Sequence, residues 1–482
     1  MKKFVTLLLL ASMLTGTIAC GGTASGNEDT TVSGGTDTTT EAVTTEEILK
    51  PDLPADANYD GYEFTFYMRS GQEKHQVIEE ESGETIDDAI YKRNQTVSDL
   101  LNVTFTTAVD SSNATGAKNS ILAGEDAYDV ILPHGRYAFS VYAMEGLGLD
   151  WHTALPYVDM DQPWWSQDAR DNFTVSDKLY AMVGDISYAA LGSTKCMFFN
   201  KNLFDEYGWD YPYQTVLDGD WTWAEFLKLS TEGSKDLNGD TKLEVATDQI
   251  GFGTTWWGTP INILFTADQH IASKDDNNEL VITLNNERTI EIFENFFKSM
   301  EEEGMYLHMA DDGTPVYNAF REGRVLFLES LIGSAETYRD MENEFGIIPC
   351  PKYDETVDEY ITGVDASTSL LIVPVTASDA ERTSVILEAL AYYSWKDVIP
   401  TYYDVALSVK YARDEESVEM MDIIREGRRF DVGYYINLPM SINSIGWQLC
   451  KREDHNFTSY YASIESNALV ELEKLNEFYR GE

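Results

Sequence analysis

Cysteine is scarce in this sequence, with four residues in a chain of 482. Cys20 lies near the start, which leaves Cys196, Cys350 and Cys450 for the rest of the chain. An odd number of thiols argues against a framework of disulfides. Cys196 and Cys350 lie in apolar runs, where a cysteine is typically a small buried hydrophobic residue rather than a nucleophile.

Basic residues are also few. The chain has 34 Lys and Arg against 83 Asp and Glu, a formal net charge of −49. Binding to nucleic acid or to an anionic membrane surface needs clustered Lys and Arg, so neither is expected. A large excess of one charge is typical of a soluble, non-aggregating exported protein, but it does not identify a ligand.

Signatures of several enzyme classes are missing, since the sequence has no CxxC pair, GxSxG elbow, HExxH motif or P-loop. Its histidines show no ligand-like spacing: His75, His134, His152, His270, His308 and His455. We therefore expect no enzyme. Among so many acidic residues a pair of catalytic carboxylates stays open, so a secreted carbohydrate-active hydrolase is kept as an alternative.

Long hydrophobic runs are lacking, and the apolar run 4–10 near the start is too short to span a bilayer. Together with Lys2, Lys3 and the small residues before Cys20, it predicts an export signal over residues 1–20. Ala19-Cys20 resembles the end of a lipoprotein signal, although Thr17 stands where Leu or Val is usual. Lipid anchoring at Cys20 is therefore the prediction, and an ordinary signal peptide with an incidental cysteine is the alternative.

Residues 21–57 consist mainly of Gly, Thr, Ser, Asp and Glu. Such a composition cannot bury enough apolar surface to offset the entropy of ordering, so we expect a disordered tether. The folded part then begins at about Asn58. Its length favours two domains.

Strands and helices alternate at the start of the folded part. The patterns predict strands at 62–68, 103–105 and 128–132 and a helix at 85–101, which indicates an α/β fold with a parallel sheet. Ligands bind beyond the carboxyl ends of strands in such sheets. The loops that follow two of these strands, residues 69–75 and 134–137, are therefore candidates for a ligand site.

The stretch 196–230 carries the clearest local pattern. An apolar strand at 196–199 is followed by a short helix closed by Gly208 and then by a loop. Thr222 precedes Glu225 by three residues, the spacing of a capping box that starts a helix. On spacing alone this pattern fits any α/β domain.

The same stretch resembles a signature of the maltose-binding-protein-like solute-binding proteins of bacterial ABC importers. The residues that carry it are Phe199, Asn200, Lys201, Leu203, Phe204, Gly208, Trp223, Glu225 and Phe226. Residues 317–327, 345–351, 369–374 and 438–449 resemble further segments of the family in family order. The resemblance implies a two-lobed periplasmic-binding-protein-like fold of type II with a ligand cleft between the lobes. The first lobe would be 58–162 plus about 345–398, and the second 163–344 plus about 399–482.

The resemblance and the aromatic residues together suggest ligand-binding positions. Tryptophan rings stack on the C–H faces of sugars, so tryptophans in a cleft favour carbohydrate. The predicted ligand residues are Arg136 and Tyr137 from the first lobe and Trp257, Glu329, Trp447 and Trp165 from the second. Glu329 is expected in a loop after a strand, and core packing is the alternative for the Trp164–Trp165 pair.

A run of oxygen-bearing residues predicts a calcium loop, which would be the protein's only cofactor. Its members are Asp236, Asn238, Asp240, Lys242 and Glu244, with related binding proteins often carrying a structural calcium loop here. Position six is Thr241 rather than Gly, and no Glu stands at position twelve. An ordinary turn rich in Asp, Asn and Gly is the other interpretation.

The resemblance implies a lipid-anchored protein outside the cytoplasmic membrane that captures a small solute, a sugar by its aromatic content, and delivers it to an ABC permease. A monomer is expected. A lipoprotein that senses the same solute is a further alternative, because transport and sensing differ only in the partner.

Overall fold

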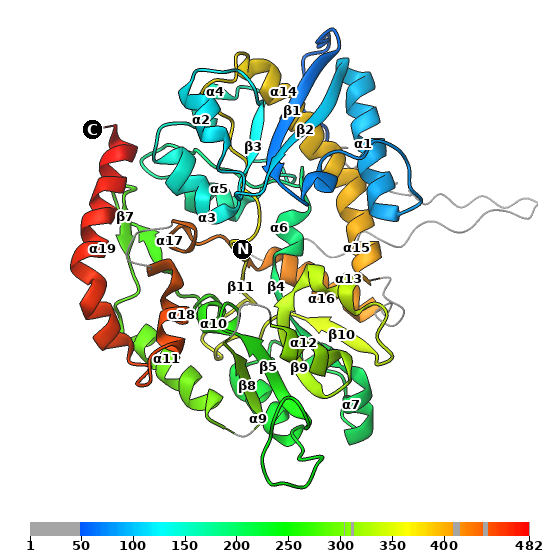
Figure 1. Cartoon of the computed structure of the whole chain (residues 1–482), viewed down its shortest axis with the longest axis vertical. Helices are drawn as coiled ribbons and strands as arrows, with labels where there is room; N and C mark the ends of the chain where they lie inside the picture. The colour runs from blue at the N-terminus through cyan, green and yellow to red at the C-terminus, as the bar shows by residue number, and fades with distance from the viewer. Residues whose placement is uncertain (1–48, 303, 310–312, 408–414, 437–441, 482) are drawn as a thin grey trace, which may run out of the picture. The chain divides into compact units, whose positions relative to one another are not determined.

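The computed structural model describes residues 49–302, 304–309, 313–407, 415–436 and 442–481. Residues 50–482 form one compact unit. Two β-sheets organise this unit, a three-stranded sheet in the upper part of Figure 1 and a five-stranded sheet in the lower part. We call the elements around the first sheet the first lobe and those around the second sheet the second lobe.

The first lobe is built on a parallel sheet in the order β2–β1–β3. The strands are β1 (Tyr62–Arg69), β2 (Val103–Asp110) and β3 (Val130–Leu132). Helices α1 (Thr85–Leu101) and α14 (Ala380–Tyr393) contact each other, and α1 also contacts β2. Ile372 lies antiparallel to Ile131 of β3, so the chain that returns from the second lobe adds to the edge of this sheet.

Residues between the first sheet and α6 (Ala189–Gly192) also belong to the first lobe. Trp164 lies 5.2 Å from Tyr392 of α14 between ring centroids, and Met182 bridges to Leu371 in the returning chain. The chain therefore enters the second lobe after α6. The predicted boundary at residue 163 is too early, because the apolar residues of this segment complete the core of the first lobe.

The second lobe is built on a mixed sheet in the order β10–β4–β9–β5–β8. Its strands are β4 (Lys195–Asn200), β5 (Ile250–Thr255), β8 (Met305–His308), β9 (Val325–Leu331) and β10 (Phe345–Ile348). Aromatic rings fill the interior: Phe226 lies 4.8 Å from Phe252 and 5.4 Å from Phe327 between centroids. Edge-to-face and tilted contacts of this kind add to the apolar burial that holds the lobe together.

Strand β10 differs from the predicted crossover. It pairs antiparallel with β4, with Phe345 opposite Asn200, and so lies in the second sheet. The predicted return to the first lobe at about residue 345 is therefore too early. The bridge between Thr194 and Val364 and the antiparallel bridge of Ser369 to His134 indicate that the chain returns near residues 364–369.

The remaining elements complete the two lobes and the C-terminal part. They are η1 (Glu73–His75), α2 (Ala117–Leu122), α3 (Gly135–Tyr137), η2 (Ala138–Ala143), α4 (Trp151–Ala154), α5 (Gln167–Phe173), α7 (Lys201–Tyr207), α8 (Tyr213–Leu217), α9 (Trp223–Glu232), α10 (Thr259–Thr266), β6 (Ala272–Lys274), β7 (Leu280–Ile282), α11 (Glu287–Met300), α12 (Thr314–Arg321), η3 (Ile332–Ser334), α13 (Ala335–Tyr338), β11 (Thr362–Gly363), η4 (Ser394–Val398), α15 (Ile399–Leu407), α16 (Glu415–Glu426), β12 (Arg428–Arg429), α17 (Val432–Tyr435), η5 (Ile442–Ser444), α18 (Ile445–Cys450) and α19 (Phe457–Arg480).

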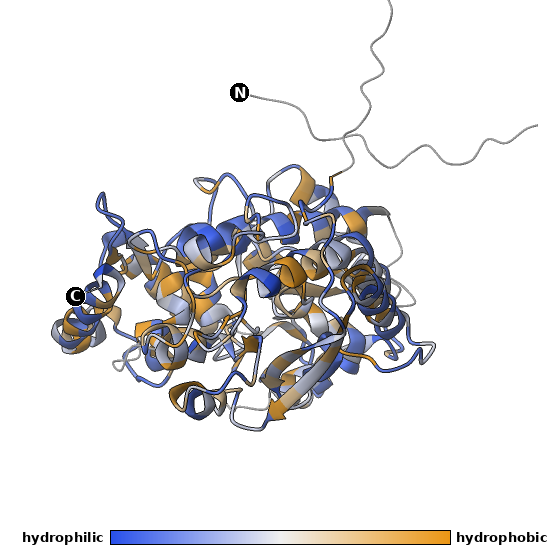
Figure 2. Ribbon diagram, turned by 90° about the horizontal axis from the view of Figure 1, so that it is seen from above, coloured by the Kyte–Doolittle hydropathy of each residue, from blue (hydrophilic) through white to orange (hydrophobic). Residues whose placement is uncertain are grey.

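Several local signals act as the sequence predicts. Helix α1 has the predicted bounds, and Gly208 ends α7 with a left-handed φ of 67°. The Thr222 hydroxyl accepts a hydrogen bond from the N–H of Glu225 and caps α9. In Figure 2 the helices carry hydrophilic and hydrophobic residues along the same ribbon, as expected for amphipathic helices with one face in the core.

The three cysteines after the first 49 residues are free thiols. Cys196 and Cys350 are buried, and Cys450 is half-buried at the end of α18. Burial raises the pKa of all three thiols, that of Cys450 to about 12. This agrees with the interpretation of Cys196 and Cys350 as small core residues.

In the part of the chain that the structure describes, no helix is both long enough and apolar enough to cross a bilayer.

Candidate ligand-binding site

The carboxyl ends of β1 and β3 bring polar residues of the first lobe together. Met68 is opposite Leu132 in the parallel register, so Arg69 and His134 leave the sheet at the same edge. Arg136 and Tyr137 follow in the short helix α3, and both are half-buried. This is the edge at which α/β sheets bind ligands.

Residues 365–369 run beside these loops. Nη2 of Arg69 donates to the carbonyl of Ser367 at 2.6 Å and to Oγ of Ser369 at 3.2 Å. The N–H of Gly135 donates to the carbonyl of Thr368 at 2.8 Å. The returning chain therefore fixes the Arg69 side chain and the start of α3 against each other.

Lys195 of the second lobe and Tyr434 of α17 meet this segment at Asp365. Nζ of Lys195, at the start of β4, lies 3.3 Å from Oδ2 of Asp365, and the Tyr434 hydroxyl of α17 donates to the same oxygen at 3.1 Å. Nζ of Lys195 also donates to the carbonyl of Trp257 at 3.0 Å. One carboxylate thus links β4, α17 and the loop after β5.

The electrostatics of this cluster favour the charged forms of Lys195 and Asp365. Burial alone would raise the pKa of the Asp365 carboxyl, but the Lys195 ammonium and hydrogen bonds from Ser367 lower it to about 2. Burial would lower the pKa of Lys195, and Asp365 raises it above its ordinary value. The two side chains form an ion pair at neutral pH.

A glycine allows the lobes to approach here. A Cβ at Gly135 would lie 2.7 Å from Cε1 of Tyr435 in α17 and 3.0 Å from the carbonyl oxygen of Ala366. Real Cβ atoms do not come so close to neighbouring atoms, so a larger residue would push α17 away from α3.

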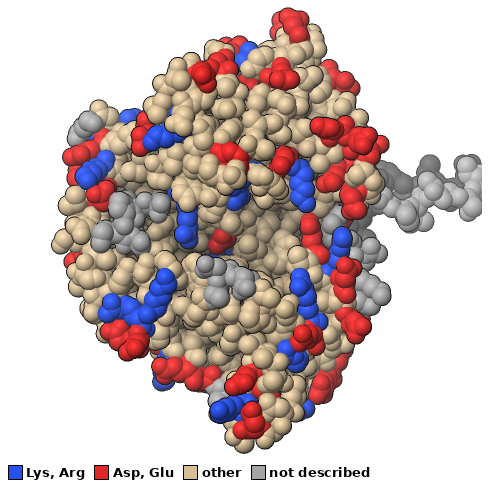
Figure 3. Space-filling model, viewed as in Figure 1, with Lys and Arg blue, Asp and Glu red and all other residues tan. Residues whose placement is uncertain are grey.

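Tryptophans surround the cluster on the side of the second lobe. Nζ of Lys195 lies 5.3 Å from the ring centroid of Trp257, and the rings of Trp256 and Trp447 are 4.9 Å apart at 38°. All three rings are half-buried. Figure 3 shows a hollow in the middle of this face, with Lys or Arg and Asp or Glu atoms at its margin. Partly exposed rings beside hydrogen-bonding groups suit a ligand with both apolar and polar faces.

Glu329, the predicted ligand carboxylate, lies deeper than expected. Residues 328–330 belong to strand β9 rather than to a loop after it, and Glu329 is 4% exposed. Its Oε2 accepts a hydrogen bond from Thr259, and burial raises its pKa to about 6. Glu329 lines a small pocket with Thr259, Asn262 and Cys350, and neither Trp257 nor Trp447 lines this pocket.

Trp165 differs from the prediction that it faces a cleft. Its side chain is 2% exposed, and its indole N–H donates to Oε2 of Glu388 at 2.8 Å. The N–H of Trp164 donates to Oε1 of the same carboxylate at 2.9 Å. Both rings therefore belong to the core of the first lobe, the alternative left open by the sequence.

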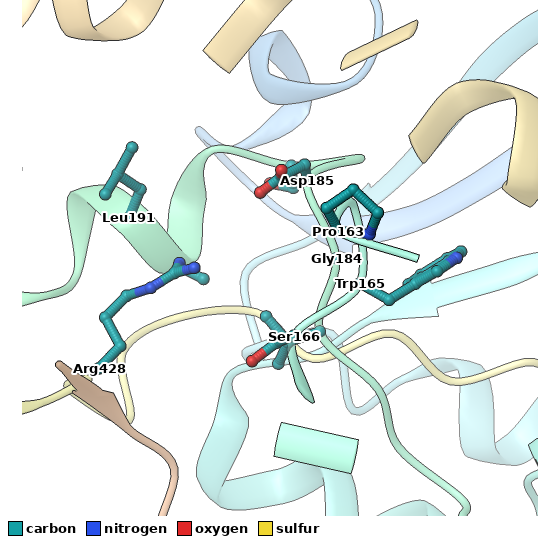
Figure 4. Close-up of a pocket in the computed structure, with 10 residues that line it drawn as sticks. Pro163, Trp165, Ser166, Gly184, Asp185, Leu191 and Arg428 are labelled. Atoms are coloured by element: carbon teal, nitrogen blue, oxygen red, sulfur yellow. The ribbon is translucent and has the colours of Figure 1, made fainter. Parts of the chain in front are cut away.

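A second pocket lies near the junction of the lobes. Figure 4 shows Arg428 of β12 reaching toward the space between Leu191, Asp185 and Ser166, whereas the ring of Trp165 points away. Asp185 of the first lobe pairs with Nη2 of Arg425 at 3.1 Å. This pocket is separate from the Lys195–Asp365 cluster, whose residues do not line it.

The predicted calcium loop is closed by its own backbone. The two carboxylate oxygens of Asp236 accept from the N–H groups of Gly239 and Thr241 at 2.6 and 2.7 Å. Asn238 and Asp240 accept from the N–H groups two residues further on, at 2.8 and 2.9 Å. Within the described ranges no group of three or more His, Cys, Asp or Glu is arranged to hold a metal ion. The observed geometry is that of a hydrogen-bonded turn, and calcium stays a prediction of the sequence alone.

Lys195, Asp365 and Tyr434 were not predicted from the sequence. A lysine directly before the apolar run 196–199 was a usable signal, because a charged residue at a fully buried strand position needs a partner. Asp365 and Tyr434 lie in irregular or short segments without any periodic pattern. The predicted segment 438–449 is partly outside the described residues, which resume at Ile442 and include Trp447.

The sequence matches the family of bacterial extracellular solute-binding proteins over residues 79–395, and the chain belongs to that family. This confirms the resemblance read from the motifs, the expectation of a binding protein rather than an enzyme, and a location outside the cytoplasm. No curated protein sequence matches the chain.

Solved structures show the same two-lobed fold. An ABC substrate-binding protein from Listeria monocytogenes in complex with cycloalternan has 15% identity and a TM-score of 0.52, covering 84% of this chain and 99% of that one. The GacH receptor of Streptomyces glaucescens, solved unliganded and with acarbose, has 14% identity and a TM-score of 0.55, covering 85% and 98%. UgpB from Mycobacterium tuberculosis in complex with glycerophosphocholine has 16% identity and a TM-score of 0.54, covering 87% and 100%. At these identities the likeness establishes the fold.

Proposed function

We propose that this protein is the lipid-anchored, extracytoplasmic binding component of an ABC importer. It captures a sugar or oligosaccharide between its lobes and delivers it to a membrane permease. The observation that carries the proposal is the cluster in which Lys195, Asp365 and Tyr434 join the two lobes beside the half-buried ring of Trp257.

The chemistry of the cluster suits a saccharide. The rings of Trp257 and Trp447 can stack on the C–H faces of sugar rings, and the charged and hydroxyl groups can bond their hydroxyls. The structurally similar proteins crystallised with cycloalternan and with acarbose support a carbohydrate ligand, although UgpB was crystallised with glycerophosphocholine.

Ligand capture follows from the two-lobed arrangement. A ligand that contacts Arg136 and Tyr137 on one lobe and Trp257 on the other makes its full set of contacts only when the lobes are closed. It therefore shifts the population toward the closed state, which the permease can then recognise.

The first experiment is thermal unfolding of residues 50–482 in the presence of mono- and oligosaccharides, with chemical recovery of each hit. A ligand that binds the folded state alone adds about 2.7 kcal/mol of stability at a hundredfold excess over its Kd. A sugar that raises the melting temperature and is recovered intact supports the proposal. Recovery of a cleaved sugar would favour the hydrolase alternative, and no shift with any sugar would refute a carbohydrate ligand.

Trp257→Ala tests the site. Loss of one stacking ring removes about 1 kcal/mol of ligand contact, and Kd is expected to rise about fivefold to tenfold. Trp209→Ala is the matched control, because Trp209 stacks on Tyr207 far along α7 and away from the cluster. Titration calorimetry gives both constants, and an equal effect of the two substitutions would contradict the assigned site.

Lipid anchoring is tested by Cys20→Ala. Without the thiol the lipid cannot be attached, so the protein should move from the membrane fraction to the soluble fraction after export. The control is Cys450→Ala, which should leave the membrane fraction unchanged. Membrane retention of the Cys20→Ala protein would refute the anchor.

A further inference from the structure

One guanidinium of the candidate site, that of Arg136, has no partner among the described residues. Arg136 is half-buried in α3, and its side chain makes no hydrogen bond or ion pair with any residue that the structure describes. Its charge acts on the Tyr434 hydroxyl. Burial and Asp365 raise the pKa of Tyr434 to about 12, and the charges of Lys195 and Arg136 oppose this rise. Helix α3 also packs against α17, which carries Tyr434, so Arg136 lies beside the cluster.

Arg69 is a second, incompletely satisfied guanidinium at the same edge. Nη2 of Arg69 uses its hydrogens on Ser367 and Ser369, both uncharged acceptors. Its Nε is buried without a partner among the described residues. The side chain thus has donors left and no carboxylate bound to it.

His134, which lies between these arginines in the sequence, is uncharged. Nδ1 of His134 accepts from the N–H of Arg136 at 3.3 Å, which requires a neutral ring with its proton on Nε2. Burial, then Arg69, and to a smaller extent Arg136 lower the pKa of His134 to about 4, against the opposing effect of Asp365. The ring stays neutral at physiological pH and so adds no charge of its own.

The nearby carboxylates do not balance the arginines. Asp365 is already engaged with Lys195 and Tyr434, and Glu329 is buried, where it accepts a hydrogen bond from Thr259. Other arginines of this acidic protein have a carboxylate within 4 Å: Arg170, Arg288, Arg324, Arg382, Arg425, Arg429, Arg452 and Arg480. Arg93 and Arg428 have none, but the guanidinium of each donates to acceptors of the protein, those of Gln76, Asn94, Ile186 and Ser394 for Arg93 and the Arg425 carbonyl for Arg428. Among the described residues that are not exposed, Arg136 therefore differs from the other arginines in having neither a carboxylate nor a hydrogen-bond acceptor.

We propose that the ligand itself supplies the missing anion: the site takes an acidic saccharide whose carboxylate or phosphate lies between Arg136 and Arg69 while a sugar ring lies on Trp257. This rests on the proposed function and names its substrate class. Guanidinium groups bind carboxylate and phosphate with paired, charge-assisted hydrogen bonds, which a neutral hydroxyl cannot match.

The test uses residues 21–482 and matched saccharides with and without an acidic group. Digalacturonate is compared with its dimethyl ester, and glucose 6-phosphate with glucose, so the two arms distinguish carboxylate from phosphate. A charge-assisted contact is expected to make the acidic member of one pair bind about tenfold to hundredfold more tightly in titration calorimetry. The preference should shrink as salt is raised, since part of the attraction is screened.

Substitutions assign the preference to its residues. Arg136→Gln should weaken binding of the acidic member much more than binding of the neutral member and so remove the preference, whereas Arg136→Lys should keep part of the preference. Arg339→Gln is the control, because Arg339 is an exposed arginine of the second lobe. If Arg136→Gln lowered the affinity for the acidic and the neutral ligand of a pair equally, Arg136 would be bonding hydroxyls, and the inference would be overturned.

The outcomes also separate this inference from the proposed function. Tight binding of neutral saccharides with no gain from charge overturns the acidic ligand and keeps the binding protein for sugars. Binding of neither member of any pair, nor of other saccharides, overturns both.

Discussion

Glu388 offers the sharpest test of the folded structure. This residue of α14 is fully buried, and its carboxylate accepts hydrogen bonds from the indole N–H groups of Trp164 and Trp165 and from the N–H of Asp159. Burial raises the pKa of the Glu388 carboxyl to about 7, although the two indole donors oppose the shift. We expect Glu388→Gln to change how stability depends on pH.

The magnitude follows from the pKa. A rise from 4.5 in the unfolded chain to about 7 in the folded protein corresponds to about 3 kcal/mol. The folded state binds more protons than the unfolded state between these values, so the contribution of Glu388 to the free energy of unfolding falls as the pH rises from 4.5 to 7. Because glutamine does not titrate, the free energy of unfolding of the variant should not include this decrease with pH.

Glutamine also has a constant effect. Its amide can accept from one indole but presents its own N–H to the other, which costs about 1–3 kcal/mol at every pH. The free energy of unfolding of Glu388→Gln relative to the natural protein should therefore improve by about 3 kcal/mol between pH 4.5 and pH 8.

Urea unfolding at pH 4.5, 6 and 8, followed by far-ultraviolet circular dichroism, measures this difference. Glu381→Gln is the matched control, since Glu381 is exposed on the same helix. A difference for Glu388→Gln that stays constant with pH to within about 1 kcal/mol would refute the assignment of a raised pKa to this carboxyl.

Two further predictions concern stability. Asp365→Asn leaves the buried Lys195 ammonium without its counter-ion, so the free energy of unfolding should fall by about 3–5 kcal/mol at pH 7. Because the pKa of Asp365 is lowered to about 2, this contribution is present above the unfolded value near 3.8 and is lost as the pH falls through 2, so the difference between the two proteins should narrow in acid. Unchanged urea midpoints at pH 7 would contradict the ion pair. Thr222→Ala removes the cap of α9 and should cost about 1 kcal/mol, whereas Thr222→Ser should cost little; equal losses in both variants would show that the hydroxyl is not the cap.

The elements that the sequence predicted best are those specified by neighbours along the chain. The spacing of Ile86, Ile90 and Val97 determines the buried face of α1, and Gly208 and Thr222 act through hydrogen bonds to their own helices. Such signals depend on a few adjacent residues, so no knowledge of the fold is needed to interpret them.

Long-range partners explain the errors. Trp164 packs against Tyr392 and Trp165 against Trp151, and the carboxylate of Glu388, more than 200 residues away, accepts both indole N–H groups. The apolar strand at 345–348 fits either sheet by composition, and its register against β4 decides between them. Both outcomes are determined by contacts that no local pattern encodes.

The candidate site was predicted only in part for the same reason. Arg136, Tyr137 and Trp257 follow strands at the ligand-binding edges, so strand prediction was enough to find them. Lys195 and Asp365 acquire their roles from each other, 170 positions apart in the chain. An aspartate in a loop and a lysine in a strand, taken separately, do not predict that the two form an ion pair.

The free thiols offer a way to measure how often parts of the natural protein open to solvent. Cys450 lies one helical turn after Trp447 in α18, and its half-buried thiol, whose pKa is raised to about 12, should react with an alkylating reagent faster whenever that helix moves and exposes it further. Cys196 and Cys350 are buried in the core, so their alkylation requires a much larger opening of the structure. The ratio of the alkylation rate of Cys450 to that of Cys196 and Cys350 therefore compares local opening beside the tryptophans with global unfolding. A ligand that holds the lobes together should slow the alkylation of Cys450. The occupancy of the site by that ligand can then be followed without an attached dye.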